Sequence, residues 1–128
     1  MTPVGLAAVV FAVASAGVIL FQIGLALGAP WGAYAMGGAY PGRFPPGLRV
    51  AAAVQAALIA FLASVVLSDA DLVVPALADQ FGWLIWLAVG FSAVSVVLNA
   101  ITRSPVERRL WLPVAIVMLL SCLLVAVA

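Results

Sequence analysis

"PVGLAAVVFAVASAGVILFQIGLALG", residues 3–28, runs from Pro3 to Gly28 without one charged side chain. A helix needs roughly 20 mostly apolar residues to cross the hydrocarbon core of a bilayer. Apolar residues here cover every face of such a helix, which is typical of a membrane span and not of a surface helix. This stretch therefore predicts a transmembrane helix.

Three further apolar runs follow the first, and the four predicted spans are approximately 3–28, 49–68, 82–102 and 110–128. The whole chain is 68% hydrophobic and 7% charged, whereas soluble domains average about 25% charged residues. A membrane β-barrel would alternate apolar and polar residues in short strands, and these runs do not. We therefore predict an all-α membrane protein, with residues 1–128 forming one antiparallel bundle of four transmembrane helices.

The positive charges lie in or beside two of the three connections. Arg43 and Arg49 lie in or beside the first connection, and Arg103, Arg108 and Arg109 lie in the third. The second connection carries only acidic residues, Asp69, Asp71 and Asp79. Positively charged connections are retained in the cytoplasm. We therefore expect the first and third connections to be cytoplasmic and both termini to be outside. The bias towards Ala, Gly, Val, Pro and Arg, with no lysine, indicates a bacterial inner (plasma) membrane.

The first connection, residues 29–48, is long and rich in glycine and proline. Pro30 should end the first helix, and Pro45-Pro46 should prevent an early start of the second. Between them Gly37-Gly38 permits the positive φ angles of a two-residue turn, so a short β-hairpin is one conformation open to this loop.

Unpaired backbone cannot lie in hydrocarbon, so the loop should sit at the cytoplasmic interface or fold over the bundle. Aromatic residues with polar tips suit that boundary. We predict an ordered cap made by Trp31, Tyr34, Gly37, Gly38 and Tyr40; the alternative is a mobile linker.

Three amide side chains fall at a common depth in the predicted spans. At about 1.5 Å of rise per residue, Gln22, Gln55 and Asn99 lie roughly 5–10 Å below the cytoplasmic boundary. An amide in hydrocarbon is unfavourable unless it is hydrogen-bonded. Two interpretations stay open. One is hydrogen bonding between helices, worth about 0.6 kcal/mol per bond. The other is a polar pocket under the loop, formed by Gln22, Gln55, Ser92, Ser95 and Asn99 and rimmed by Arg49 and Arg103.

Local signals describe the helix ends and the packing faces. "SPVE", residues 104–107, predicts a capping box with Ser104 as N-cap and Pro105 at the first helical position. We therefore interpret Glu107 as a cap and not as a catalytic acid. Gly24-x-x-x-Gly28 and a stripe of small residues in the second span suit close approach of helices, within the bundle or between protomers. That stripe consists of Ala53, Ala57, Ala60 and Ser64.

The sequence contains few side chains that are suited to enzymatic catalysis. The chain has no histidine and a single cysteine, Cys122. No span carries a pair of carboxylates for acid–base work. Three aspartates in one outer loop offer at most weak cation contact. We expect no catalytic residue, no metal site, no cofactor and no nucleic-acid partner.

Two families of similar size can be compared with these residues. Small multidrug antiporters carry a membrane-embedded glutamate in their first helix, where this chain has Gln22, which cannot exchange a proton. Vitamin K epoxide reductase-like proteins need paired cysteines. The chain instead resembles a group of short, uncharacterised bacterial four-helix integral membrane proteins. The residues that carry this resemblance are "LGAPWG" (27–32), "GG" (37–38), the proline-rich approach to Arg49, and "NAITRSPVERR" (99–109). The resemblance implies a fold and no activity.

Two functional hypotheses follow from these observations. The first is a non-enzymatic protein of the inner membrane that self-associates or serves as an accessory subunit of a membrane complex. Its partners would be membrane lipids and either copies of itself or other membrane subunits. The second is a small transporter or binding protein for a lipid or a small neutral solute, with the 29–48 loop as gate.

The arginine distribution predicts the outcome of a reporter experiment. A reporter that is active only in the cytoplasm should give no signal when it is fused after Ala128, because the C-terminus is expected outside. The same reporter fused after Arg109, in a chain truncated there, should be active. A strong signal from the Ala128 fusion would contradict the orientation.

Overall fold

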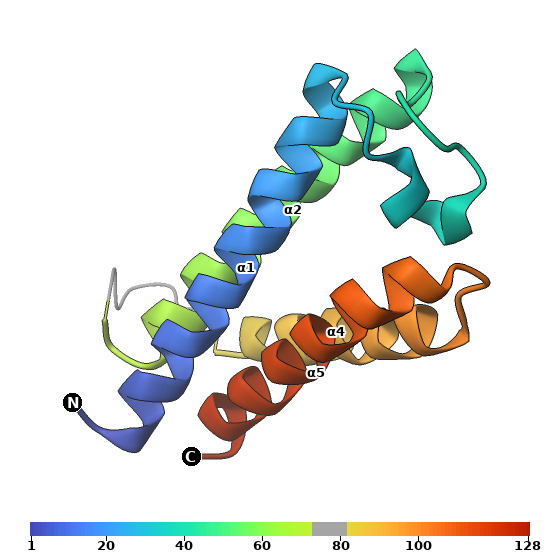
Figure 1. Cartoon of the computed structure of the whole chain (residues 1–128). Helices are drawn as coiled ribbons and strands as arrows, with labels where there is room; N and C mark the ends of the chain where they lie inside the picture. The colour runs from blue at the N-terminus through green and yellow to red at the C-terminus, as the bar shows by residue number, and fades with distance from the viewer. Residues whose placement is uncertain (73–81) are drawn as a thin grey trace.

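A computed structural model describes residues 1–72 and 82–128 of the chain. These residues form four long helices, α1 (Pro3–Leu27), α2 (Pro46–Asp69), α4 (Leu84–Ile101) and α5 (Pro105–Val127). Each is long and apolar enough to cross a membrane (Figure 1). The prediction of an all-α, four-helix protein is thus confirmed, and its four apolar helices make it a multi-pass membrane protein. Asp79 of the second connection lies outside the described residues.

The helix ends follow local chemistry. The Oγ1 atom of Thr2 accepts a hydrogen bond from the backbone N–H of Gly5 at 3.0 Å and caps α1. Gly28 ends α1 with a φ of 95°, a left-handed conformation that suits glycine. The α5 helix begins at Pro105, before the apolar run at 110, because Ser104 caps it: the Ser104 Oγ accepts a bond from the Glu107 N–H at 3.2 Å.

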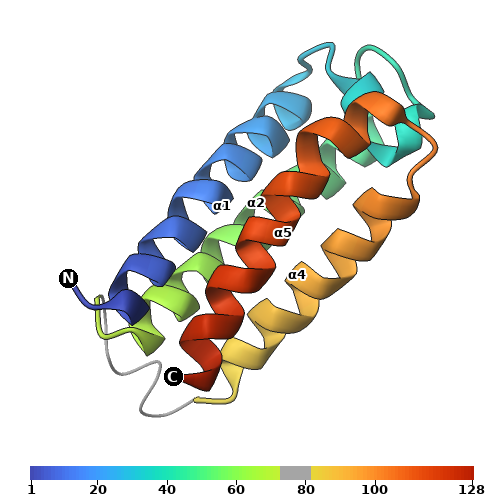
Figure 2. The ribbon, with the colours of Figure 1, turned by 60° about the horizontal axis from the view of Figure 1, so that its bottom comes forward.

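The four helices pack as two antiparallel hairpins, α1–α2 and α4–α5. Both termini lie at one end of the bundle, and the α1–α2 and α4–α5 connections lie at the other (Figure 2). The hairpins meet chiefly through α1 and α5, whereas α2 and α4 make fewer contacts. Near the termini the hairpins are joined by a core that includes the fully buried Ala8, Phe11, Val66, Ala88 and Cys122. Towards the other end they diverge (Figure 1).

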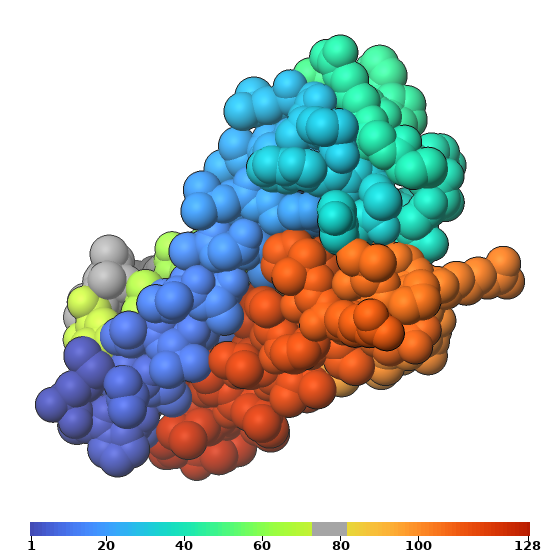
Figure 3. Space-filling model, in the orientation of Figure 1, coloured from blue at the N-terminus to red at the C-terminus, as the bar shows by residue number. Residues whose placement is uncertain are grey.

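The first connection fills part of the space between the diverging hairpins (Figures 1 and 3). It contains two short 3₁₀ helices, η1 (Gly32–Tyr34) and η2 (Met36–Gly38). The β-hairpin considered for this loop is not formed, and the described residues contain no strand. The reason is local: Met36, Gly37 and Gly38 all have positive φ angles, of 54°, 68° and 76°. Three such residues in succession curl the chain and leave no extended arms to pair.

The two small-residue motifs serve different surfaces. A Cβ added at Gly24 would overlap the ring of Trp31, and one added at Gly28 would come 2.7 Å from the Arg43 Nε. The Gly24-x-x-x-Gly28 motif therefore receives side chains of the first connection and not another helix. The α2 stripe is different, because its four members are all exposed.

Candidate functional site

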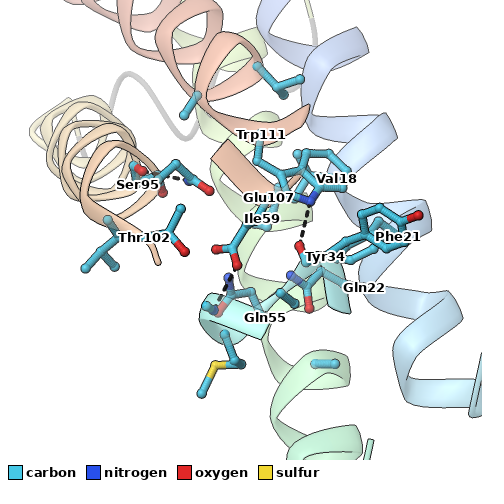
Figure 4. Close-up of a pocket in the computed structure, with 18 of the residues that line it drawn as sticks. Val18, Phe21, Gln22, Tyr34, Gln55, Ile59, Ser95, Thr102, Glu107 and Trp111 are labelled. Atoms are coloured by element: carbon cyan, nitrogen blue, oxygen red, sulfur yellow. Dashed lines mark hydrogen bonds between the residues drawn. The ribbon is translucent and has the colours of Figure 1, made fainter. Parts of the chain in front are cut away.

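A cavity of about 570 Å³ lies under the first connection, where the hairpins diverge (Figure 4). All four helices and both 3₁₀ helices contribute to its wall. Its volume falls within the range of about 300–1,000 Å³ that is typical of ligand sites. Apolar side chains such as Ile59, Phe91 and Met118 form much of the wall.

Five of the seven predicted pocket residues line this cavity: Gln22, Gln55, Ser95, Asn99 and Arg103. Ser92 does not, because it is fully buried further along α4, where the Cys122 Sγ lies 3.7 Å from its Oγ. Arg49 does not either. Its Nε donates to the carbonyl oxygen of Ala26 at 2.9 Å and so binds one of the free carbonyls at the end of α1.

The amide side chains of the cavity and Ser95 do not join one helix to another. The Asn99 Nδ2 donates to the Ser95 carbonyl at 2.7 Å, and the Ser95 Oγ donates to the Phe91 carbonyl at 2.9 Å, both within α4. Among the residues that the structure describes, the side chains of Gln22 and Gln55 have no hydrogen-bond partner. The cavity therefore contains two amides that are free to bind a ligand.

The exposure of the wall shows where the cavity opens. On α2, Ala51 and Gln55 are exposed, and on α4 Leu98 and Ile101 are 57% and 69% exposed. On α5, by contrast, the lining residues Ala115 and Met118 are buried. The opening thus lies between α2 and α4, which make fewer contacts with each other than α1 and α5 do. In a bilayer this side of the bundle faces lipid.

The predicted cap residues divide between the inside and the outside of the loop. Tyr34 and Gly37 line the cavity. Trp31 lies outside it and stacks on Phe21, with ring centroids 6.0 Å apart and planes 10° apart. Tyr40 makes an edge-to-face contact with Phe44 at 6.3 Å.

A Cβ at Gly38 would make ordinary van der Waals contacts, 3.5 Å from the Ala33 carbonyl oxygen and 3.6 Å from the Ser104 Cβ. All five residues predicted for the cap belong to the first connection.

Three hydrogen bonds attach this segment to the start of α5. The Gly37 N–H donates to the Glu107 Oε2 at 2.8 Å, and the Trp111 Nε1–H donates to the Tyr34 carbonyl at 3.0 Å. A longer bond of 3.4 Å runs from the Ser104 Oγ to the Ala33 carbonyl. The Trp111 ring also packs on Phe21 of α1, with centroids 4.7 Å apart. These contacts hold the loop over the cavity.

Glu107 and Trp111 line the cavity but were not among the residues predicted for the pocket, and Glu107 was interpreted as a helix cap. Ser104 does cap α5, but the Glu107 carboxylate does not return to the Ser104 N–H, which instead donates to the Thr102 Oγ1 at 3.3 Å. The carboxylate lines the cavity and binds Gly37, 70 residues away in the sequence. No local pattern marks such a distant partner.

Comparison of the chain with known protein families, with curated proteins and with solved structures found no match. The assignment of a function therefore rests on the cavity and its residues.

The backbone of the loop leads to a stability prediction. Replacing both Gly37 and Gly38 with valine should destabilise the protein, because their φ angles of 68° and 76° disfavour a β-branched side chain. A left-handed conformation costs roughly 1–2 kcal/mol per residue, so the melting midpoint in detergent should fall by several degrees. The control is the double valine variant of Gly47 and Gly90, where an added Cβ meets nothing within 4 Å. Equal melting of the two variants would show that the loop is only a tether.

Proposed function

We propose that the protein binds a lipid or a small neutral solute from the membrane in the cavity under the first connection. The observation that carries this proposal is the pair of unpartnered amides, Gln22 and Gln55, on an apolar wall. An amide without a hydrogen bond in an apolar site costs about 1–3 kcal/mol, judged from mutated proteins. A ligand with hydrogen-bonding groups would remove that cost at both side chains.

The opening between α2 and α4 gives such a ligand a route from the bilayer. The first connection, residues 29–48, serves as gate on the other side of the cavity. It is attached to α5 by three hydrogen bonds, each worth about 0.5–1.5 kcal/mol net. Releasing the loop thus costs a few kcal/mol, which the binding energy of a ligand can offset. The proposal includes the orientation with both termini outside, a bacterial inner membrane and a role without catalysis, which the arginine distribution and the composition support.

Native mass spectrometry of the protein purified in mild detergent tests the binding role. We expect a retained small molecule on the wild-type protein. The Gln22→Leu/Gln55→Leu variant should bind it about thirtyfold more weakly, since two hydrogen bonds of about 1 kcal/mol each are lost and each 1.4 kcal/mol is about a factor of ten. Ser64→Ala is the control, because Ser64 is exposed on α2 and does not line the cavity. A wild-type protein that never retains a ligand would contradict the proposal, and so would a double variant with unchanged occupancy.

Self-association, or association with another membrane subunit, is a second candidate function. It is favoured by the stripe of Ala53, Ala57, Ala60 and Ser64, whose members are all exposed. At about 100° per residue this stripe lies on the face of α2 opposite Gln55. Small residues let helices approach closely and gain dispersion energy in a membrane. A contact there would leave the opening between α2 and α4 free.

Oxidative crosslinking in native membranes tests this second function. Ala57→Cys should form a disulfide-linked dimer, because it lies in the middle of the stripe. Leu58→Cys is the matched control: Leu58 is also exposed, but it points about 100° away from Ala57 around the helix. The native Cys122 is buried and should not react. Equal dimer formation by the two variants, or none by either, would argue against a contact through the stripe.

A further inference from the structure

We infer that the ligand of the cavity is a zwitterionic phospholipid whose head group carries a phosphate and a primary ammonium. This inference rests on the proposed binding function and specifies the class of ligand. The head group would lie between Arg103 and Glu107, and the acyl chains would leave between α2 and α4.

The two charged residues of the cavity wall are available to a ligand. Arg103 and Glu107 both line the cavity. In residues 1–72 and 82–128, Arg103 forms no hydrogen bond or ion pair, with Glu107 or with any other group. Glu107 uses one oxygen, Oε2, for the Gly37 N–H. Its other oxygen remains open, since an ionised carboxylate accepts bonds at both oxygens.

The chemistry of these two groups matches a phosphate and an ammonium. The planar guanidinium of arginine binds phosphate through two parallel hydrogen bonds. A primary ammonium has three N–H donors and pairs with a carboxylate. Arg103 is exposed at the rim of the cavity, and Glu107 is half-buried. A ligand with only one of these charges would pair with only one of the two residues. A neutral zwitterion with both charges satisfies the two residues together.

The positions of the groups fit the layers of a lipid. Glu107 is the third residue of α5, and Arg103 precedes that helix by two residues, so both lie at the end of the bundle that carries the first connection. Trp31, Tyr34 and Trp111 lie at the same end, and such aromatic residues are enriched at the head-group level of membranes. Gln22 and Gln55 lie farther from that end of the bundle, on α1 and α2. Their N–H groups would meet the ester carbonyls that follow the phosphate in a phospholipid.

The size and opening of the cavity fit a head group with its chains outside. A volume of about 570 Å³ corresponds to a site for a drug-sized molecule, which suits a head group and glycerol and not a whole two-chain lipid. The exposed Leu98 and Ile101 flank the opening on α4. Acyl chains that pass them would remain in the hydrocarbon of the bilayer.

Native mass spectrometry from nanodiscs of mixed dioleoyl lipids tests this inference. The probes are phosphatidylethanolamine, phosphatidylcholine and phosphatidylglycerol in equal amounts. We expect the ethanolamine lipid to be retained about tenfold more than the choline lipid, because a quaternary ammonium has no N–H to donate to Glu107 and so cannot form a charge-assisted hydrogen bond. Equal retention of these two lipids, or a preference for phosphatidylglycerol, would overturn the inference while the binding function stands. Retention of no lipid and no other ligand would overturn both.

Four variants test the roles proposed for Glu107 and Arg103 in binding the head group. Glu107→Gln should abolish the preference for the ethanolamine lipid, and Arg103→Gln should lower the retention of all three lipids. Arg109→Gln, whose side chain does not line the cavity, should change neither. Trp111→Phe removes a different loop bond without changing a charge. If Trp111→Phe abolished the ethanolamine preference as Glu107→Gln does, the effect would come from the loop and the inference would be wrong.

Competition with a soluble compound tests whether the head group comes from a membrane lipid. Glycerophosphoethanolamine carries the same phosphate and ammonium without acyl chains. It should fail to displace the bound lipid at millimolar concentration, because it lacks the chains that lie in the bilayer. Displacement by this compound at the concentration of the lipid itself would overturn a membrane source for the ligand.

Discussion

The Glu107 carboxylate accepts a hydrogen bond from the Gly37 N–H at 2.8 Å, and this contact joins two segments that are 70 residues apart in the sequence. It attaches the first connection to α5, and the Trp111–Tyr34 bond supports it nearby. Backbone at the boundary of a membrane must find hydrogen-bond partners within the protein or in the interface. Here α5 supplies one of those partners. The roof of the cavity depends on this contact.

The bundle is closed at one end and open at the other, and the facing side chains differ in polarity between the two ends. Near the termini small and apolar residues such as Ala8 and Ala88 let the helices meet, and dispersion stabilises their contact. Towards the first connection the facing residues are longer and more polar, as with Gln22, Gln55 and Asn99. Asn99 binds within its own helix, and the glutamines find no partner across the gap. The helices diverge there, and the cavity lies between them.

The arrangement separates the surfaces proposed for two roles. The cavity opens between α2 and α4, whereas the stripe of small residues lies on the opposite face of α2. A copy of the chain that packed on the stripe would leave the opening accessible from the bilayer. The loop, the opening and the stripe thus occupy three different sides of the bundle. Binding and association can coexist without competition for residues.

The four helices could be predicted from the sequence because the length and the local composition of an apolar run determine a membrane span. A common depth was predicted for Gln22, Gln55 and Asn99, since helical rise converts sequence distance into depth, and all three line the cavity. The interpretation was incomplete for Arg49, Ser92 and Glu107. Each of these side chains has a partner or a burial that depends on a second segment. Local patterns carry no information about such partners.

By itself, the sequence determined the four apolar helices, the cap of α5 at Ser104 and the need for glycine where the first connection turns with positive φ. Only the tertiary structure decided that the glutamines line a cavity and do not bond between helices, that Glu107 holds the loop, and that Gly24 receives the Trp31 ring. The physical reason is that helix formation in a membrane follows from short-range composition, whereas the pairing of polar side chains depends on which helix faces meet. That choice is made by packing over the whole bundle.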